Sequence, residues 1–183
     1  MRGGGLAETR VPFDDDWYEV VQDGSKLLQG DLLSACPILR LDRDVPYPLP
    51  DEIPTIVQPA DIVVLTQSCD SDQNKVTGVV CCTHFDLEEA KEKNQQLSRK
   101  NVLEEIKKGR HVRYTLLAAR DAHPSIRLRI VDLGDIFVLP KTFLEKVAAS
   151  QNPRLRLRTP YREHLAQAFG RFYMRVALPR EPF

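Results

Sequence analysis

The stretch that decides the fold is Ala60-Asp-Ile-Val-Val-Leu-Thr-Gln-Ser-Cys-Asp-Ser-Asp72, in which an apolar run ends abruptly at a polar, thiol-bearing segment. A short unbroken run such as Ile62 to Leu65 is typical of a strand that is buried on both faces. We therefore predict a strand over residues 62–66 and a return strand over residues 76–83. The polar end of the first strand carries the tip residues Thr66, Gln67, Cys69 and Asp70.

The remaining local signals predict about six short strands and three or four helices, without a β-α-β alternation. This pattern favours an α+β fold: a small, strongly bent antiparallel β-barrel of the SH3-like kind, with a helical insertion and a C-terminal helix. We predict one domain over residues 1–183. Its parts would be a flexible arm at 1–12, barrel strands within 27–84 and 112–158, the insertion at 86–108 and the last helix at 160–176.

Four local features carry definite expectations. Gly30-Asp31 lies inside a predicted strand over residues 27–33 and indicates a bulge or a close backbone approach. Five prolines between residues 44 and 59 predict a surface excursion rather than a central strand. Asp86 followed by Glu89 is a capping box that opens a helix. Gly134-Asp135 is expected to separate two strands.

Composition limits the class of protein. The chain has 183 residues, of which 42% are hydrophobic, so it can bury a core. No stretch approaches the roughly 18 apolar residues of a membrane span. The N-terminal residues lack a secretory pattern, so we predict a cytoplasmic protein with no membrane partner.

The formal net charge is zero, but the charges are unevenly distributed. The first 75 residues are acidic, whereas Glu163 is the only acid between Gln151 and Arg180, among seven arginines. Two interpretations are open: the two ends neutralise each other across the fold, or the Arg-rich end meets an anionic partner.

The last helix is predicted to have two faces. Leu165, Phe169, Phe172 and Val176 recur at helical spacing and form an apolar stripe, and His164 lies on the adjoining polar face. Arginine is suited to bidentate recognition of phosphate. The candidate binding residues for nucleic acid or a partner are therefore Arg154, Arg156, Arg158, Gln167, Arg171 and Arg175.

Cys69 is the best-placed thiol for nucleophilic chemistry, with His164 or His84 as the candidate base. The alternative is a packed structural cysteine, because Asp70 beside it would raise the pKa of the thiol. Together these residues predict a catalytic pair of Cys69 and His164 as the enzymatic alternative.

A metal site is the other use of the cysteines. Cys36, Cys69, Cys82 and His84 have suitable ligand chemistry, but their spacing matches no zinc motif. We therefore predict neither a metal nor a cofactor. Adjacent Cys81 and Cys82 would point to opposite faces of a strand.

The segments Gln29–Leu33, Asp61–Gln67 and Val79–Thr83 together resemble the strand order of the PemK/MazF-like barrel over about residues 27–84. The resemblance implies a small barrel, often dimeric, of a family composed mostly of endoribonuclease toxins from bacterial toxin–antitoxin modules. That family places an arginine used in RNA cleavage just before the central strand, where this chain has Gln58-Pro-Ala-Asp61. The chain also resembles bacterial proteins of unknown function that share Leu65–Asp70 and Tyr161–Leu165.

These observations lead to three hypotheses. The first is a non-catalytic accessory or binding protein of a bacterial toxin–antitoxin or antiphage-type system, which binds RNA or another protein of the same locus through the Arg-rich end. The second is an enzyme, either a MazF-like endoribonuclease or a Cys-His hydrolase. The third is a scaffold whose helical insertion docks a partner.

Overall fold

The computed structural model describes residues 17–22, 26–42, 44–53, 55–68 and 76–174. The predicted arm at 1–12 and the predicted site residues Cys69, Asp70 and Arg175 lie outside these ranges. The strands are β1 Tyr18–Val21, β2 Leu32–Leu41, β3 Thr55–Val64, β4 Gly78–Asp86, β5 Tyr114–Leu117, β6 Arg129–Pro140 and β7 Arg154–Leu157. The helices are α2 Leu87–Lys93, the 3-10 helix η2 Gln95–Ser98, α3 Lys100–Lys107, α4 Lys141–Ser150 and α5 Tyr161–Tyr173.

The fold is α+β, as predicted, with two antiparallel sheets. The larger sheet has five strands in the order β2-β3-β4-β6-β5, and β1 pairs with β7 in a separate two-stranded sheet. Among the described strands neither sheet closes on itself, so the expected barrel is not confirmed. No helix in the described ranges is long and apolar enough to cross a membrane.

The predicted organising strand is β3, which lies between β2 and β4. Its apolar run is buried on both faces, because alternate residues enter different core clusters. Val63 and Leu65 pack with β1, β7 and α5, whereas Ile62 and Val64 pack with α4. Cys82 and Cys81 divide in the same way, which confirms the prediction that they face opposite sides of the sheet.

The helical insertion begins as its capping box predicts. The Asp86 carboxylate accepts hydrogen bonds from the backbone amides of Glu88 and Glu89. The insertion is not simply a solvated excursion, because Leu87, Leu97 and Ile106 form a third buried cluster with Ile130 of β6. The insertion is therefore attached to the large sheet by its own apolar face.

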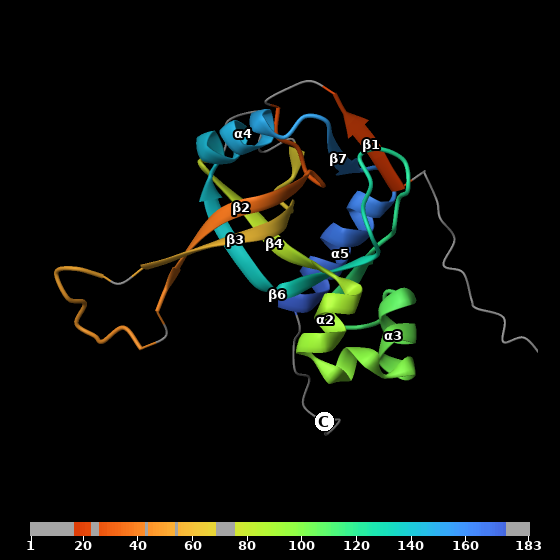
Figure 1. The fold of residues 1–183 in the computed structure, drawn as a ribbon, viewed down its shortest axis with the longest axis horizontal. Coiled ribbons are helices and arrows are strands. Elements are labelled where there is room, and N and C mark those ends of the chain that lie inside the picture. Colours follow the sequence, from red (N-terminus) through yellow and green to blue (C-terminus); the bar gives the residue numbers. More distant parts are fainter. Residues whose placement is uncertain (1–16, 23–25, 43, 54, 69–75, 175–183) are drawn as a thin grey trace, which may run out of the picture.

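β2 and β3 extend away from the body as a long hairpin arm (Figure 1). Pro59 lies inside β3, although its segment was predicted to be a surface excursion. It is tolerated because β4 pairs with β3 only at Ile62–Val64, so beyond that point β3 has β2 as its single partner. The exposure of the segment was predicted correctly and the strand was missed.

Two strand boundaries also differ from the prediction. Residues 27–30 precede β2 and are not strand residues, and Gln29 and Gly30 form a turn. β6 runs without interruption through Gly134-Asp135, because the irregularity is taken up by a register shift opposite Cys82 and Thr83 of β4.

Gly30 makes the close backbone approach that its position in the sequence indicated. Its φ is +86°, and a Cβ at this position would lie 3.0 Å from the Cβ of Leu157. Leu157 donates its amide to the Gly30 carbonyl at 2.9 Å. This contact joins the small sheet to the start of β2.

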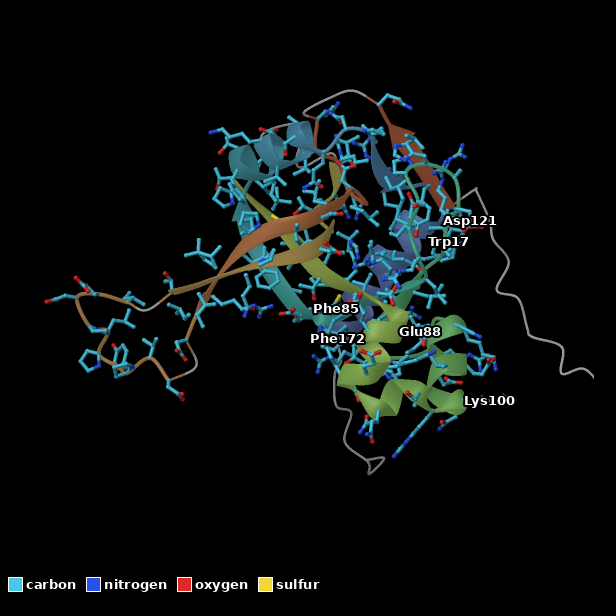
Figure 2. All side chains as sticks on the ribbon, viewed as in Figure 1. Trp17, Phe85, Glu88, Lys100, Asp121 and Phe172 are labelled. Carbon is cyan, nitrogen blue, oxygen red and sulfur yellow. The ribbon has the colours of Figure 1, made fainter. Side chains whose placement is uncertain are left out.

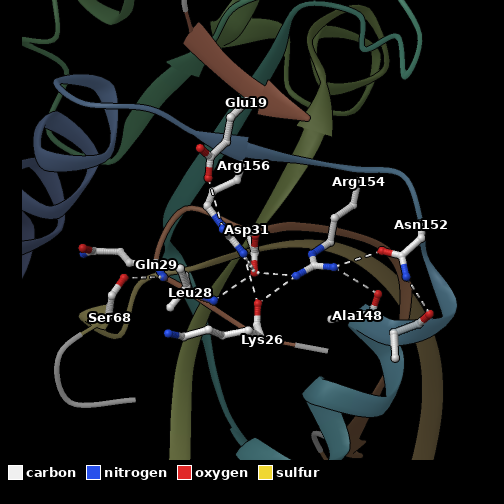
Figure 3. Close-up of polar contacts among 11 residues, drawn as sticks. Glu19, Lys26, Leu28, Gln29, Asp31, Ser68, Ala148, Asn152, Arg154 and Arg156 are labelled. Atoms are coloured by element: carbon white, nitrogen blue, oxygen red, sulfur yellow. Dashed lines mark hydrogen bonds and ion pairs between the residues drawn. The ribbon is translucent and has the colours of Figure 1, made fainter. Parts of the chain in front are cut away.

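Asp31 lies beside that contact, and its side chain is fully buried. Figure 3 shows the guanidiniums of Arg154 and Arg156 meeting at its carboxylate. Arg156 donates to it through Nε at 2.6 Å and through a terminal nitrogen at 3.1 Å. Arg154 donates at 3.3 Å, and the backbone amide of Leu28 donates at 2.9 Å. Arg156 also reaches Glu19 of β1 at 3.1 Å. One carboxylate thus holds two arginines of β7.

Replacing Asp31 with Asn should destabilise the fold strongly, because two buried guanidiniums would lose the buried carboxylate charge that they share. We expect a loss of about 3–5 kcal/mol in the free energy of unfolding, measured by urea denaturation. The exposed Glu88–Lys91 pair provides a control, and Glu88→Gln should cost about 0.5 kcal/mol or less. Equal losses in the two variants would contradict this account.

Candidate functional site

The arginines predicted to form a binding face separate into two groups. Arg154 and Arg156 are buried, with 3% and 8% of their surface exposed, and they point into the Asp31 network. They are therefore not available to a partner, which corrects their assignment as binding residues. For these two, the alternative interpretation of pairing with the acidic N-terminal half is confirmed. Arg158, just after β7, is exposed.

The polar face of α5 behaves differently. His164, Gln167 and Arg171 are exposed on it, while Leu165 is buried and Phe169 packs against the core. The two faces predicted for this helix are therefore both present in its described part. The three polar residues line one cavity of about 620 Å³, which we call the α5 groove.

The opposite wall of the α5 groove comes from the helical insertion and β5. The last residues of α3 and those after it, Lys107, Lys108 and Gly109, line the groove, as does Leu116 of β5. Gly109 has a φ of +63°, which ends α3 in the left-handed conformation expected of a C-terminal glycine. Arg171 donates to the Gly109 carbonyl at 3.4 Å and so spans the groove from α5 to this helix end.

An aromatic pair lies at the end of the groove where α5 begins. The rings of Trp17 and Tyr161 are stacked, with centroids 4.0 Å apart and an interplanar angle of 14°. Both side chains line the groove and are only partly buried. Figure 2 labels Trp17 at the edge of the molecule where β1 starts.

The lining charges of the groove are mainly positive. Lys107, Lys108 and Arg171 contribute three cations, and Glu104 is the carboxylate among the described lining residues. Glu104 lies 3.7 Å from the Lys107 ammonium, so its charge is largely compensated. The groove therefore combines surplus positive charge, an amide, an imidazole and stacked rings, a set suited to binding an anionic ligand that carries aromatic groups.

The strand tip has a structural role in its described part. The Thr66 hydroxyl accepts a hydrogen bond from the Val80 amide at 2.8 Å, and the Ser68 hydroxyl accepts one from the Gln29 amide at 3.2 Å. Gln67 is exposed. These three residues do not line the α5 groove, and Cys69 and Asp70 are outside the described ranges. The pairing of Cys69 with His164 therefore stays a prediction.

The described part of the candidate metal set does not converge. Cys36 and Cys82 belong to core clusters on opposite faces of the sheet. Burial raises the pKa of the Cys36 thiol to about 11 and that of Cys82 to about 12, so both are neutral thiols at physiological pH. Among the described residues no group of three or more His, Cys, Asp and Glu is placed to hold a metal ion.

Sequence reasoning missed Trp17, Lys107 and Lys108 as groove residues. Trp17 is far from α5 in the sequence, and only the pairing of β1 with β7 brings it there. The two lysines were part of an insertion of mixed charge. The sequence signal for them was Lys-Lys-Gly directly after the apolar Ile106. A glycine that follows basic residues is typical of the C-terminal end of a helix, so the two lysines were expected at that end.

Comparison with known proteins adds no relative to these observations. A scan against family models, a search of curated proteins and a search of solved structures each found no match for this chain.

Proposed function

We propose that this protein binds single-stranded RNA in the α5 groove without cleaving it. The observation that carries the proposal is the row of exposed polar residues on α5, His164, Gln167 and Arg171, facing the lysines at the end of α3 across one cavity. The proposal keeps the predicted binding role of α5 and removes Arg154 and Arg156 from it.

The groove chemistry matches the two features common to all single strands. Lysine and arginine side chains bind the phosphate backbone, and aromatic rings offer stacking surfaces that accept any base. Trp17 and Tyr161 already stack on each other, so a base would extend the existing stack. The volume of about 620 Å³ is within the range of roughly 300–1,000 Å³ typical of ligand sites.

Cleavage is left out of the proposal because the chain lacks the arginine that the PemK/MazF-like family uses for it just before the central strand, where this chain has Gln58-Pro-Ala-Asp61. The described lining of the groove carries the imidazole of His164 and the carboxylate of Glu104, and Glu104 pairs with Lys107 at 3.7 Å. A role in a toxin–antitoxin or antiphage-type system stays a prediction.

Replacing Arg171 with Ala should weaken RNA binding by about 5- to 10-fold at low salt. The slope of the logarithm of the binding constant against the logarithm of the salt concentration should become shallower by about 0.7, which is the value for one phosphate contact on a single strand. The measurement is fluorescence anisotropy with a labelled RNA of about 12 nucleotides at several salt concentrations. Arg162 provides the matched control, because it is on the same helix but pairs with Glu163 at 2.9 Å. Arg162→Ala should bind like the unchanged protein.

Two results would overturn the proposal. One is the absence of RNA binding by the unchanged protein at low salt. The other is an equal loss in the Arg162 and Arg171 variants, which would indicate a general charge effect rather than a site.

A second function, self-association through the β2–β3 arm, is favoured by the apolar face of that hairpin. Leu39 and Val57 are directly opposite each other and are 65% and 60% exposed. Pro37, Pro59 and Leu41 continue the same exposed face. Proteins rarely leave a contiguous apolar face of this kind exposed, and a two-stranded ribbon has little stability alone. A second copy of the chain offers the same face for symmetric pairing.

The double variant Leu39→Ser/Val57→Ser should therefore raise the dimer dissociation constant by about tenfold or more, because four large apolar side chains are lost per dimer. Sedimentation velocity over a range of concentrations measures this. Leu49→Ser, in the loop of the arm, removes a similar side chain away from the paired strands and is the control. An unchanged protein that remains monomeric at high concentration would refute self-association.

A further inference from the structure

The residues of α5 that line the groove follow one another along the helix at regular intervals. Tyr161, His164, Gln167 and Arg171 all line the α5 groove, and successive members are three or four residues apart. This spacing keeps them on one side of the helix, because an α-helix has about 3.6 residues per turn. With a rise of about 1.5 Å per residue, the backbones of Tyr161 and Arg171 are about 15 Å apart along the helix axis. α5 therefore sets the distance between the two ends of the groove.

The two ends of the α5 groove differ in chemistry. At the first end Tyr161 stacks on Trp17, with the ring centroids 4.0 Å apart. At the second end Arg171 donates to the Gly109 carbonyl at 3.4 Å, which places its guanidinium beside the chain segment that carries Lys107 and Lys108. Among the described residues that line the groove, the cations are these three. Stacking surface and positive charge are thus at opposite ends.

The part of the groove between these ends combines hydrogen-bonding groups with apolar surface. His164 and Gln167 are exposed there and carry an imidazole and an amide. Leu116 of β5 and Ala168 of α5 belong to the same lining. The faces of nucleic-acid bases pack on apolar and aromatic surfaces, and their edges form hydrogen bonds. The chemistry of the middle of the groove therefore suits bases that follow the one on the rings.

We propose that the α5 groove holds a window of about four nucleotides of a single strand, since a stacked strand advances by about 3.4 Å per nucleotide and the groove ends are about 15 Å apart. The base at one end of the window lies on the Trp17–Tyr161 pair. The phosphates at the other end lie at Arg171 and the two lysines. This inference rests on the proposed RNA binding and adds to it the length of the bound segment and the division of its contacts.

The first test is the affinity of the full chain for RNA of about two, four, eight and 12 nucleotides, measured by fluorescence anisotropy at low salt. We expect a gain of about 20-fold or more from two to four nucleotides, because a dinucleotide cannot reach both ends of the groove. From four to eight nucleotides we expect a gain of about fivefold, which is the number of overlapping four-nucleotide windows in the longer RNA. A dinucleotide that binds as tightly as a tetranucleotide would overturn the window.

The fluorescence of Trp17 gives a second readout, because Trp17 is the single tryptophan of the chain. A base that stacks on the Trp17–Tyr161 pair should quench it. The probes are four-nucleotide RNAs that are abasic except for one base. A base at one of the two ends should quench at about tenfold lower RNA concentration than a base in the middle, which reaches the rings only if a phosphate leaves the cationic end. Equal quenching wherever the base is placed would contradict the proposal.

Two variants separate the contacts at the two ends of the groove. In Trp17→Leu/Tyr161→Leu, a four-nucleotide RNA with bases and its fully abasic counterpart should bind with equal affinity, because the stacking surface is gone. Arg171→Ala should bind both about fivefold more weakly and keep the difference between them. Arg162→Ala, the control, should behave like the unchanged protein. A difference that persists in the double variant, with an unaltered circular dichroism spectrum, would overturn the assignment of the base to the rings.

The length series also separates the window from RNA binding itself. If RNA of about 12 nucleotides binds but affinity rises by the same factor at every doubling of length, the window is refuted and the proposed RNA binding stands. If RNA of no length binds at low salt, the proposed RNA binding is refuted, and the window with it.

Discussion

The rest of the structure depends on the burial of Asp31 against Arg154 and Arg156. Its carboxylate accepts hydrogen bonds from both guanidiniums and from the Leu28 amide, at the point where Gly30 touches Leu157. The two sheets share no strand, and they are joined by these ion pairs and by the backbone hydrogen bond from Leu157 to Gly30. A buried network of this kind contributes little net stability when complete and costs much when broken. It therefore specifies how the sheets dock more than it strengthens the fold.

This docking determines which charges reach the surface. With Arg154 and Arg156 drawn inward, the positive charge available to a partner near α5 comes from Arg171 and from the two lysines that end α3. The pairing of β1 with β7 also brings Trp17 against Tyr161. The α5 groove is thus assembled from Trp17, the end of α3, β5 and α5, and its composition is a consequence of the same contact that removes the expected arginines from it.

Features determined by neighbouring residues were predictable from the sequence. The Asp86 cap, the close approach at Gly30 and the opposite facing of Cys81 and Cys82 each follow from local geometry. The apolar face of α5 was also predictable, because the helical spacing of its apolar residues determines which side of the helix they share. Long-range partners were not predictable: an Arg-Leu-Arg-Leu strand looks half-exposed until Asp31, over a hundred residues away, is placed beside it. The continuous β6 was missed for the same reason: residues 133–135 of β6 bulge between the partners of Cys82 and Thr83, and β6 pairs with β4 on both sides of the bulge.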